Sequence, residues 1–435
     1  MTRRLLLSLL ALALGAAAAA AQTEVRIDVS GGGRRIPLHC EPLAAAGDRN
    51  PKLPSTLADE VLASDLDQSA VFVVTRAWRG EQPFDVQAIV SGRWTVKGTE
   101  VTLTGEVRDF PARRPILSKE YRAPLAGWRA IVHQFADDVV LQFTGEPGIA
   151  GTRIAFVVRE GRDKELCVMD ADGANPVALT ADRSLALSPS WSPDGSLLLF
   201  TSYRGGGGPR VWVMQAAGGR PYLVSGRPGN NTSAAYSPDG REIALTLSAD
   251  GNSEIYVLDA RGGSPRRLTD NRAIDTSPSW SPTGREIAFT SDRGGTPQVY
   301  VMERDGGNVR RLTYDVNYTD SPAWSPRGDR IAFVARTGSG FDLYVCRADG
   351  GDARLVVGGG SNENPHWSPD GRHLVFASNR DGGFALYVTD LDNRAPRKLD
   401  TGGRPAMSPA WAPRLAGLVT AQVSTPNHSN SGGKP

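Results

Sequence analysis

One phrase, Ser-Pro-x-Trp-Ser-Pro-Asp-Gly, recurs in six near-copies along this 435-residue chain. Successive copies of its aromatic residue are separated by 45, 44, 44, 43 and 44 residues. A step of about 40 to 45 residues is the period of a four-stranded propeller blade, in which similar units pack around a central axis. The repeat therefore predicts a β-propeller. The aromatic residues are Trp191, Tyr236, Trp280, Trp324, Trp367 and Trp411.

Each repeat has the pattern of four short strands joined by tight turns. In the copy that begins at Ser277, the phrase ends in Ser-Pro-Thr-Gly, and a type I turn favours Pro at its second position and Gly at its fourth. Alternating apolar residues and Gly-containing loops follow, which is typical of half-buried strands. The predicted strands cover residues 277–280, 286–290, 298–302 and 309–313.

The two ends of the repeat array complement one another. Residues 152–158, 165–169 and 177–180 match the second, third and fourth strands of a repeat, but no first strand precedes them. The last copy, residues 408–413, is a first strand without the other three. Pairing the two fragments would close the ring and remove two exposed sheet edges. Five whole repeats and one split repeat predict six blades.

The first 21 residues have the features of a secretory signal. Two arginines precede an apolar run from Leu5 to Ala20, and the segment ends in small residues. We expect residues 1–21 to be removed on export. No later segment reaches the roughly 20 consecutive apolar residues that span a bilayer, so we expect a soluble mature protein without direct membrane insertion.

The charge balance bears on the kind of partner. The formal net charge is +2, from 49 Lys and Arg against 47 Asp and Glu, and two of the arginines lie in the signal. Nucleic acids and anionic membranes select basic surfaces, which a near-neutral chain does not offer. We therefore expect protein partners, no nucleic acid, no cofactor, no metal, and a monomer.

Residues 22–147 lack the repeat and predict a small α+β domain. A helix is expected from Ser55, because Ser and Thr cap helices and Leu57, Val61 and Leu66 fall on one face. A second helix is expected over residues 128–143, with apolar residues at helical spacing. The predicted strands between them cover residues 71–75, 86–96, 99–108 and 116–121. Residues 145–151 link this domain to the propeller, residues 148–416.

Both ends of the mature chain differ from the two domains. Residues 24–29 alternate like a strand, and a Gly-rich stretch follows them. A strand on a flexible tether can add to a sheet edge of a partner, or it can be the first strand of its own domain. Both alternatives stay open. Residues 417–435 are rich in Ser, Asn, Gly and Pro, and this composition predicts a disordered tail.

The three cysteines do not form a sequence motif. Cys40, Cys167 and Cys346 are an odd number without a short-range pair, which excludes a disulfide scaffold and a zinc site. Cys167 and Cys346 fall in apolar third strands and are predicted core residues. A disulfide at Cys40 stays open. The repeated tryptophans are predicted to pack between blades and not to form a ligand cage.

The order of these parts resembles the TolB family, the periplasmic component of the Tol–Pal system. The resemblance rests on the signal, the small α+β domain with its Glu24-Val25-Arg26-Ile27 strand, and the six-bladed ring. Residues 87–109 also look like the first domain of that family. The likeness covers nearly the whole mature chain. It implies a periplasmic adaptor, not an enzyme, that supports outer-membrane constriction in cell division and envelope integrity.

The resemblance also implies two binding regions. The lipoprotein Pal would bind the propeller face around the central channel, and TolA would recognise the N-terminal strand at Glu24, Val25, Arg26, Ile27 and Asp28. The Pal-facing positions fall in what the pattern predicts as loops before the first strands, and such repeated loops lie on one face of a ring. They are Asn230, Asn231, Thr232, Ser233, Asp275, Thr276, Ser277, Thr319, Asp320, Ser321, Asn362, Glu363 and Asn364. Capping of turns would select the same residue types.

Two of these features depart from the family pattern. Asn230 stands where the family often has His, so a pairing that needs an imidazole would be lost. Residues 30–33 are more Gly-rich than expected for the hinge behind the N-terminal strand.

Other functions need features that the sequence largely lacks. A propeller peptidase needs a Gly-x-Ser-x-Gly elbow, and the chain contains none. A metal-dependent propeller hydrolase needs several channel ligands, whereas His366 and His373 fall in one repeat without a second cluster. An exported propeller that binds glycans or another protein stays open as the alternative. Among the predicted face loops, Tyr318 is the one aromatic candidate for a sugar contact.

Overall fold

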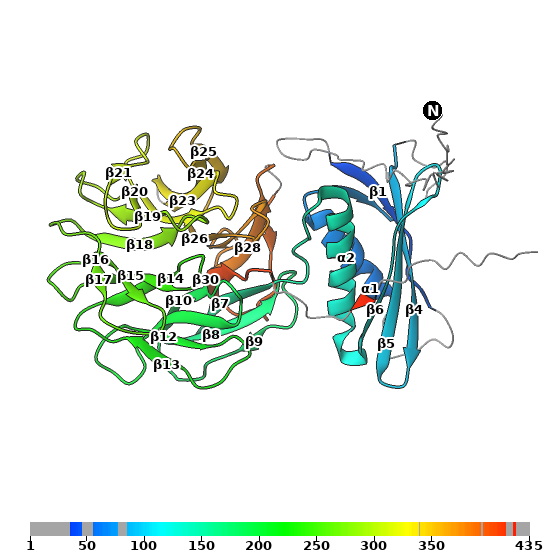
Figure 1. Cartoon of the computed structure of the whole chain (residues 1–435), viewed down its shortest axis with the longest axis horizontal. Coiled ribbons are helices and arrows are strands. Elements are labelled where there is room, and N and C mark those ends of the chain that lie inside the picture. The colour runs from blue at the N-terminus through cyan, green and yellow to red at the C-terminus, as the bar shows by residue number, and fades with distance from the viewer. Residues whose placement is uncertain are drawn as a thin grey trace, which may run out of the picture.

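The computed structural model describes residues 35–45, 55–76, 85–338, 340–392, 395–414 and 421–422. They form a helix-and-sheet domain and a ring of six four-stranded sheets, which lie side by side in Figure 1. The predicted fold class is confirmed. The expected signal and the N-terminal strand lie outside the described residues.

The sheet of the first domain combines parallel and antiparallel strands. Its order is β3-β1-β4-β5-β6-β31, and β2 also pairs with β4. Strands β4, β5 and β6 form an antiparallel meander, whereas β1 pairs in parallel with both β3 and β4. The strands are β1 (Ile36–Cys40), β2 (Ala44–Ala45), β3 (Phe72–Thr75), β4 (Ala88–Lys97), β5 (Glu100–Asp109) and β6 (Pro115–Pro124).

Two helices cover the face of this sheet that points towards the propeller (Figure 1). They are α1 (Ser55–Gln68) and α2 (Trp128–Thr144), and a short 3-10 turn, η1 (Leu125–Gly127), precedes α2. Both helices and the strands share one apolar core that includes Leu62, Phe135 and Trp94. Helix α2 ends at Gly145, whose φ of 76° is the left-handed conformation that glycine adopts readily. The predicted helices and strands of this domain are therefore present, but β1 and β2 were not predicted.

The ring consists of six blades, numbered here from the first complete one. Blade 1 comprises β10 (Ala186–Trp191), β11 (Leu197–Ser202), β12 (Arg210–Gln215) and β13 (Tyr222–Ser225). Blade 2 comprises β14 (Asn231–Tyr236), β15 (Glu242–Leu247), β16 (Glu254–Asp259) and β17 (Arg266–Arg267). Blade 3 comprises β18 (Asp275–Trp280), β19 (Glu286–Ser291), β20 (Gln298–Glu303) and β21 (Arg310–Arg311).

The remaining blades complete the circle. Blade 4 comprises β22 (Thr319–Trp324), β23 (Arg330–Thr337), β24 (Gly340–Arg347) and β25 (Arg354–Val357). Blade 5 comprises β26 (Asn362–Trp367), β27 (His373–Ser378), β28 (Ala385–Asp390) and β29 (Arg397–Lys398). Blade 6 comprises β30 (Ala406–Trp411), β7 (Arg153–Glu160), β8 (Asp163–Asp170) and β9 (Val177–Ala178). The last strand, β30, pairs antiparallel with β7, which confirms the predicted split blade.

The recurring phrase makes the turn between the first two strands of a blade. In blade 1, the Asp194 carboxylate accepts hydrogen bonds from Ser192 Oγ at 2.5 Å and from the backbone N–H of Ser196 at 3.0 Å. Gly195 follows with a φ of 68°, where a side chain would be strained. The Ser, Asp and Gly of the repeat are thus explained by a tight turn that the Asp carboxylate stabilises by hydrogen bonds.

The predicted core residues are buried. The tryptophans of the repeat are 4 to 8% exposed. The indole N–H of Trp191 donates to the carbonyl of Ala410 in blade 6 at 2.9 Å, and that of Trp367 donates to Ala323 in blade 4 at 2.9 Å. Cys40, Cys167 and Cys346 are all buried and free, so Cys40 is not in a disulfide.

The C-terminal tail is described only at Ala421–Gln422. These two residues form β31, which pairs antiparallel with Tyr121 and Glu120 of β6. The prediction of disorder over residues 417–435 does not hold at this pair, because β6 offers an open sheet edge there. No helix among the described residues is long and apolar enough to cross a membrane.

Candidate protein-binding face and inter-domain cavity

The predicted Pal-facing residues begin the innermost strands of blades 2 to 5. Of the thirteen, only Asn230 precedes its strand, so the prediction that they lie in loops is wrong for the other twelve. The strands begin earlier than the sequence suggests because their first residues already pair with the second strand of the blade, as Asn231 does with Leu247 and Asp275 with Ser291. The pairing makes these segments rigid.

The first residue of each of these strands is a structural anchor. Asn231, Asp275, Thr319 and Asn362 are 0% exposed. The amide Nδ2 of Asn231 donates to the carbonyls of Arg227 at 2.8 Å and Pro209 at 3.2 Å. The Asp275 carboxylate accepts a hydrogen bond from Arg293 Nη2 at 2.8 Å. Because these four side chains are fully buried, they cannot contact a partner directly.

The second and third residues of the same strands remain partly accessible. Thr232, Thr276, Asp320 and Glu363 are half-buried, as are Ser233, Ser277, Ser321 and Asn364, and Asn230 is exposed. The third residues have φ values of 51 to 56° at an irregularity in the strand pairing. One second residue is also tied across blades, since Asp320 Oδ1 accepts a hydrogen bond from Thr290 Oγ1 at 2.8 Å.

The third residues of these strands line the central channel, a cavity of about 530 Å³. Its wall is built from the recurring phrase, so that serine and proline line it from all six blades, with tryptophan from five blades and Tyr236 from blade 2. No Asp, Glu, Lys or Arg is among the described residues that line it. His366 is the one histidine among the described residues of this wall, and its Nδ1 accepts the backbone N–H of Trp411 at 3.2 Å. Burial lowers the pKa of His366, so the imidazole is neutral.

Two side chains considered for other functions are placed differently. His373 lines the inter-domain cavity and not the channel, so it does not join His366 in one site. Tyr318 is half-buried, with the guanidinium of Arg336 stacked 4.4 Å from its ring centroid and Phe341 against its edge. Tyr314 is the strongly exposed aromatic of that loop, at 68%.

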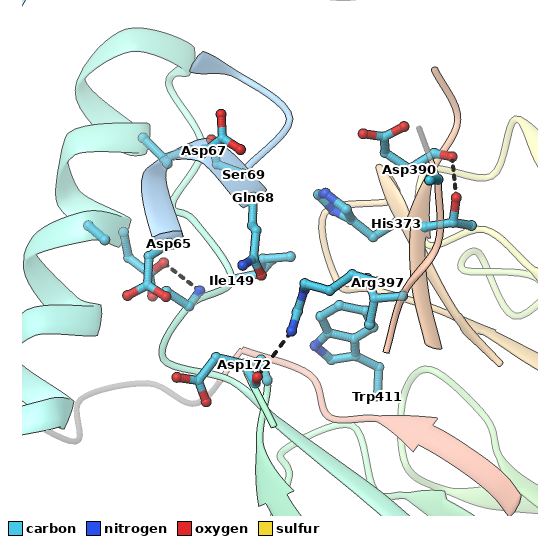
Figure 2. Close-up of a pocket in the computed structure, with 18 residues that line it drawn as sticks. Asp65, Asp67, Gln68, Ser69, Ile149, Asp172, His373, Asp390, Arg397 and Trp411 are labelled. Carbon is cyan, nitrogen blue, oxygen red and sulfur yellow. Dashed lines mark hydrogen bonds between the residues drawn. The ribbon is translucent and has the colours of Figure 1, made fainter. Parts of the chain in front are cut away.

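A second cavity lies between the two domains and was not anticipated from the sequence. It has a volume of about 230 Å³ and is lined by the end of α1, by α2, by the linker and by blades 5 and 6 (Figure 2). Its wall is acidic. Asp65, Asp67, Asp137, Asp172 and Asp390 line it, with Arg397 as the basic residue.

Two aspartates of this wall, Asp65 and Asp172, contact basic side chains beside the cavity. His133 Nδ1 lies 2.7 Å from Asp65 Oδ2, and its Nε2 lies 3.9 Å from Asp172 Oδ2. Arg129 forms an ion pair with Asp172, and Arg397 Nη1 donates to the Asp172 backbone carbonyl at 3.1 Å, the contact dashed in Figure 2. Asp65 and His133 belong to the first domain, whereas Asp172 and Arg397 belong to the ring.

The same three residues, Asp65, His133 and Asp172, have the geometry of a possible metal site. Their ligand atoms lie within 4.8 Å of one another. Burial disfavours a charge on His133, but the carboxylates of Asp65 and Asp172 outweigh burial and raise its pKa to about 9. A metal ligated by His133 would have to displace the imidazole proton, and Arg129 already pairs with Asp172. The cluster of described residues forms ion pairs, and the pair of Arg129 with Asp172 joins the two domains.

Other polar contacts cross the same interface. Arg35 Nη2 lies 2.7 Å from Asp390 Oδ2 and 3.1 Å from Asp392 Oδ2 in blade 5. Asp137 of α2 accepts the backbone N–H groups of Ala150 at 2.7 Å and Gly151 at 2.9 Å, which fixes the linker. Burial raises the pKa of Asp137 to about 7 despite these hydrogen bonds. A local sequence pattern cannot predict such contacts, because Arg35 and Asp390 are 355 residues apart.

The architecture and the repeat now permit a comparison with known proteins. The family model described as the TolB beta propeller domain matches residues 140–415. The chain belongs to the TolB β-propeller family. The Tol-Pal system protein TolB of Anaeromyxobacter sp. (strain K) is 39% identical over 233 residues, which cover 50% of this chain and 53% of that protein. The protein TolB homolog of Chlorobium chlorochromatii is 36% identical over 163 residues, which cover 38% of this chain and 36% of that protein.

The likeness is longer in structure than in sequence. The crystal structure of TolB from Acinetobacter baumannii superposes with a TM-score of 0.78 at 25% identity, covering 88% of this chain and 98% of that chain. That coverage extends over both domains. The chain spans about half the length of the Anaeromyxobacter relative, 53%, in the sequence alignment.

Proposed function

We propose that this chain is a non-enzymatic periplasmic adaptor of the Tol–Pal system. In this role the propeller face at the channel mouth binds the lipoprotein Pal, and the N-terminal strand, residues 24–28, binds TolA. The likeness to the Acinetobacter TolB structure over 88% of this chain carries the proposal, because it includes the small domain as well as the ring. The adaptor would support outer-membrane constriction during division.

The accessible residues at the starts of the inner strands suit this face. Thr276 and Glu363 are half-buried second residues of β18 and β26, and they sit next to fully buried anchors. A partner would therefore meet polar groups on a rigid frame, which lowers the ordering cost of binding. The anchors themselves would act indirectly, by holding that frame.

Replacement of the accessible residues should weaken Pal capture without loss of stability. We expect Thr276→Arg with Glu363→Lys to lower the affinity for purified Pal about tenfold or more, since bulk and opposite charge enter the contact. Surface plasmon resonance measures capture, and thermal unfolding checks the fold. Leu355→Ala, at a residue 48% exposed on the outer strand β25, serves as the control. Unchanged capture by the double variant would contradict the face assignment.

Deletion of residues 23–30 should abolish TolA binding and leave Pal binding intact or stronger. The physical reason is that a strand that adds to a partner's sheet supplies most of the backbone hydrogen bonds of that contact. Pull-down with the purified TolA domain measures the loss, and Pal capture by the same variant is the control. Equal TolA binding with and without these residues would refute this half of the proposal.

A further inference from the structure

A groove on the side of the ring has more basic than acidic side chains in its lining. It has a volume of about 560 Å³ and lies between the outer part of blade 6 and blade 1. Leu179 to Asp182 form one wall, and Trp212 lies on the other. Three arginines line it, Arg204, Arg210 and Arg220, against one carboxylate, Asp182.

The other blades show what is unusual about blade 1. Arg210 is the first residue of β12, opposite Ser202, and the strand registers place Glu165, Glu254, Gln298 and Asp342 at the same position in blades 6, 2, 3 and 4. Three of these are acceptors that fasten the loop before the next blade. Thr180 donates to Glu165 at 2.5 Å, Thr269 to Glu254 at 2.5 Å, and Thr313 to Gln298 at 2.7 Å. Blade 5 has Ala385 at this position, and only blade 1 has a basic residue there, Arg210.

A second acceptor is missing from the same blade. In blades 2 and 5 an aspartate of the preceding loop accepts the hydroxyl of the strand tyrosine, as Asp381 does from Tyr387 at 2.6 Å. Strand β12 has Trp212 in place of that tyrosine, and the loop has Gly205 in place of the aspartate. The indole Nε1 of Trp212 is consequently buried without a hydrogen-bond partner.

The groove therefore holds donors without acceptors. Arg204 is stacked on Trp212, 5.1 Å from the ring, and is paired with Asp182. Arg210 is half-buried and Arg220 is exposed, and neither has an ion pair or a side-chain hydrogen bond within the part of the chain that the structure describes. An unpaired guanidinium beside a buried N–H group favours an anionic ligand, because both carboxylate oxygens can be bound in the planar fork.

We propose that this groove binds an acidic segment of a partner protein. Arg210 begins β12 and Arg220 lies beyond its other end, so the two are separated by the length of a six-residue strand, about 20 Å. An extended chain with several carboxylates could contact both arginines along the groove. Leu223, paired with Trp212 and 47% exposed, adds an apolar contact at the edge. This site is separate from the channel mouth.

Fluorescence anisotropy with a labelled glutamate-rich peptide containing one leucine tests the proposal on the full mature chain. We expect saturable binding that weakens as salt rises from about 0.05 M to about 0.3 M, since the contact is between charges. The double variant Arg210→Glu, Arg220→Glu should bind about tenfold more weakly or worse. Arg261→Glu changes an exposed arginine in the corresponding turn of blade 2 and should leave binding within about twofold.

Several outcomes would overturn the proposal. They are the absence of peptide binding by the native chain, equal binding by the double variant, and equal loss in the Arg261→Glu control. Binding of polyphosphate as strongly as the peptide would assign the groove to polyanions in general and not to a protein segment. Arg210→Gln, which keeps the stem of the side chain, replaces the glutamate variant if thermal unfolding shows that the latter does not fold. Pal capture should be unchanged in all variants, so failure here leaves the adaptor proposal untouched.

Discussion

The joints between blades and the joint between the two domains are held by different forces. Adjacent blades share apolar clusters, such as the one in which Phe376 and Trp367 of blade 5 meet Ala332 of blade 4. The domains are joined by charged groups, among them the pairs of Arg129 with Asp172 and of Arg35 with Asp390. Apolar burial does not depend on protonation, whereas a buried ion pair does. Conditions that leave the ring intact can therefore loosen its contact with the first domain.

The largest expected effect is loss of a core ring inside a blade. Phe376→Ala removes a side chain that is 0% exposed, and such truncations cost about 3 to 5 kcal/mol of unfolding free energy through lost burial and the cavity left behind. Urea unfolding followed by tryptophan fluorescence measures it. The loss should be the same at about pH 6 and about pH 10 if the blades are held by apolar contacts. A cost below about 1 kcal/mol would contradict that account.

A smaller and pH-dependent effect is expected at the domain joint. The folded-state pKa of His133 is about 9, above its ordinary value of 6.5, so its contribution is fully present below about pH 6.5 and is lost as pH rises through about 9. His133→Gln should therefore destabilise the chain at about pH 6 but change little at about pH 10.

Differential scanning calorimetry of native chain and variant at both pH values measures the His133 effect. Phe376→Ala is the matched control, because its cost should not vary with pH. If His133→Gln destabilised equally at the two pH values, the joint would not depend on the imidazolium. The proposed difference between apolar contacts among the blades and charged contacts between the domains would then be wrong.

The smallest effect is expected for an ion pair on the outer rim of a blade. Arg310 Nη2 lies 3.0 Å from Glu286 Oε1, but the two side chains are 43% and 36% exposed. Exposed pairs contribute about 0 to 1 kcal/mol, because water screens them and their side chains lose freedom. Arg310→Ala should shift the urea midpoint only slightly at low salt and not at all at high salt. A loss comparable to that of Phe376→Ala would show that charge also holds the blades.

The repeat permitted prediction of most of the ring, including the split blade, because strands of one blade are neighbours in sequence and a turn signal separates them. The first domain was predicted less completely. Strand β1 escaped detection, since it pairs in parallel with β3 and β4 and no hairpin turn marks it. Nearly every residue of β1 is buried, which also removes the alternation of apolar and polar residues that identifies a half-buried strand.

Some of the predicted face residues are fully buried and others are accessible, and residue type does not distinguish the two groups. Asn231 and Asn230 are the same amino acid, yet the first is fully buried and the second is exposed. Burial here depends on where the strand pairing begins, which the neighbouring strand decides. A polar residue before a strand therefore predicts a turn or an anchor as readily as a binding contact.

By itself, the sequence determined the number of blades, the closure of the ring and the burial of the repeated tryptophans, because all three follow from one local pattern repeated at a constant step. Only the tertiary structure decided which polar residues meet. Asp65 and His133, 68 residues apart, meet Asp172 across the domain interface, and Arg210 lines a groove together with residues of blade 6. Such contacts depend on how separate segments pack, and no periodicity in the chain encodes that packing.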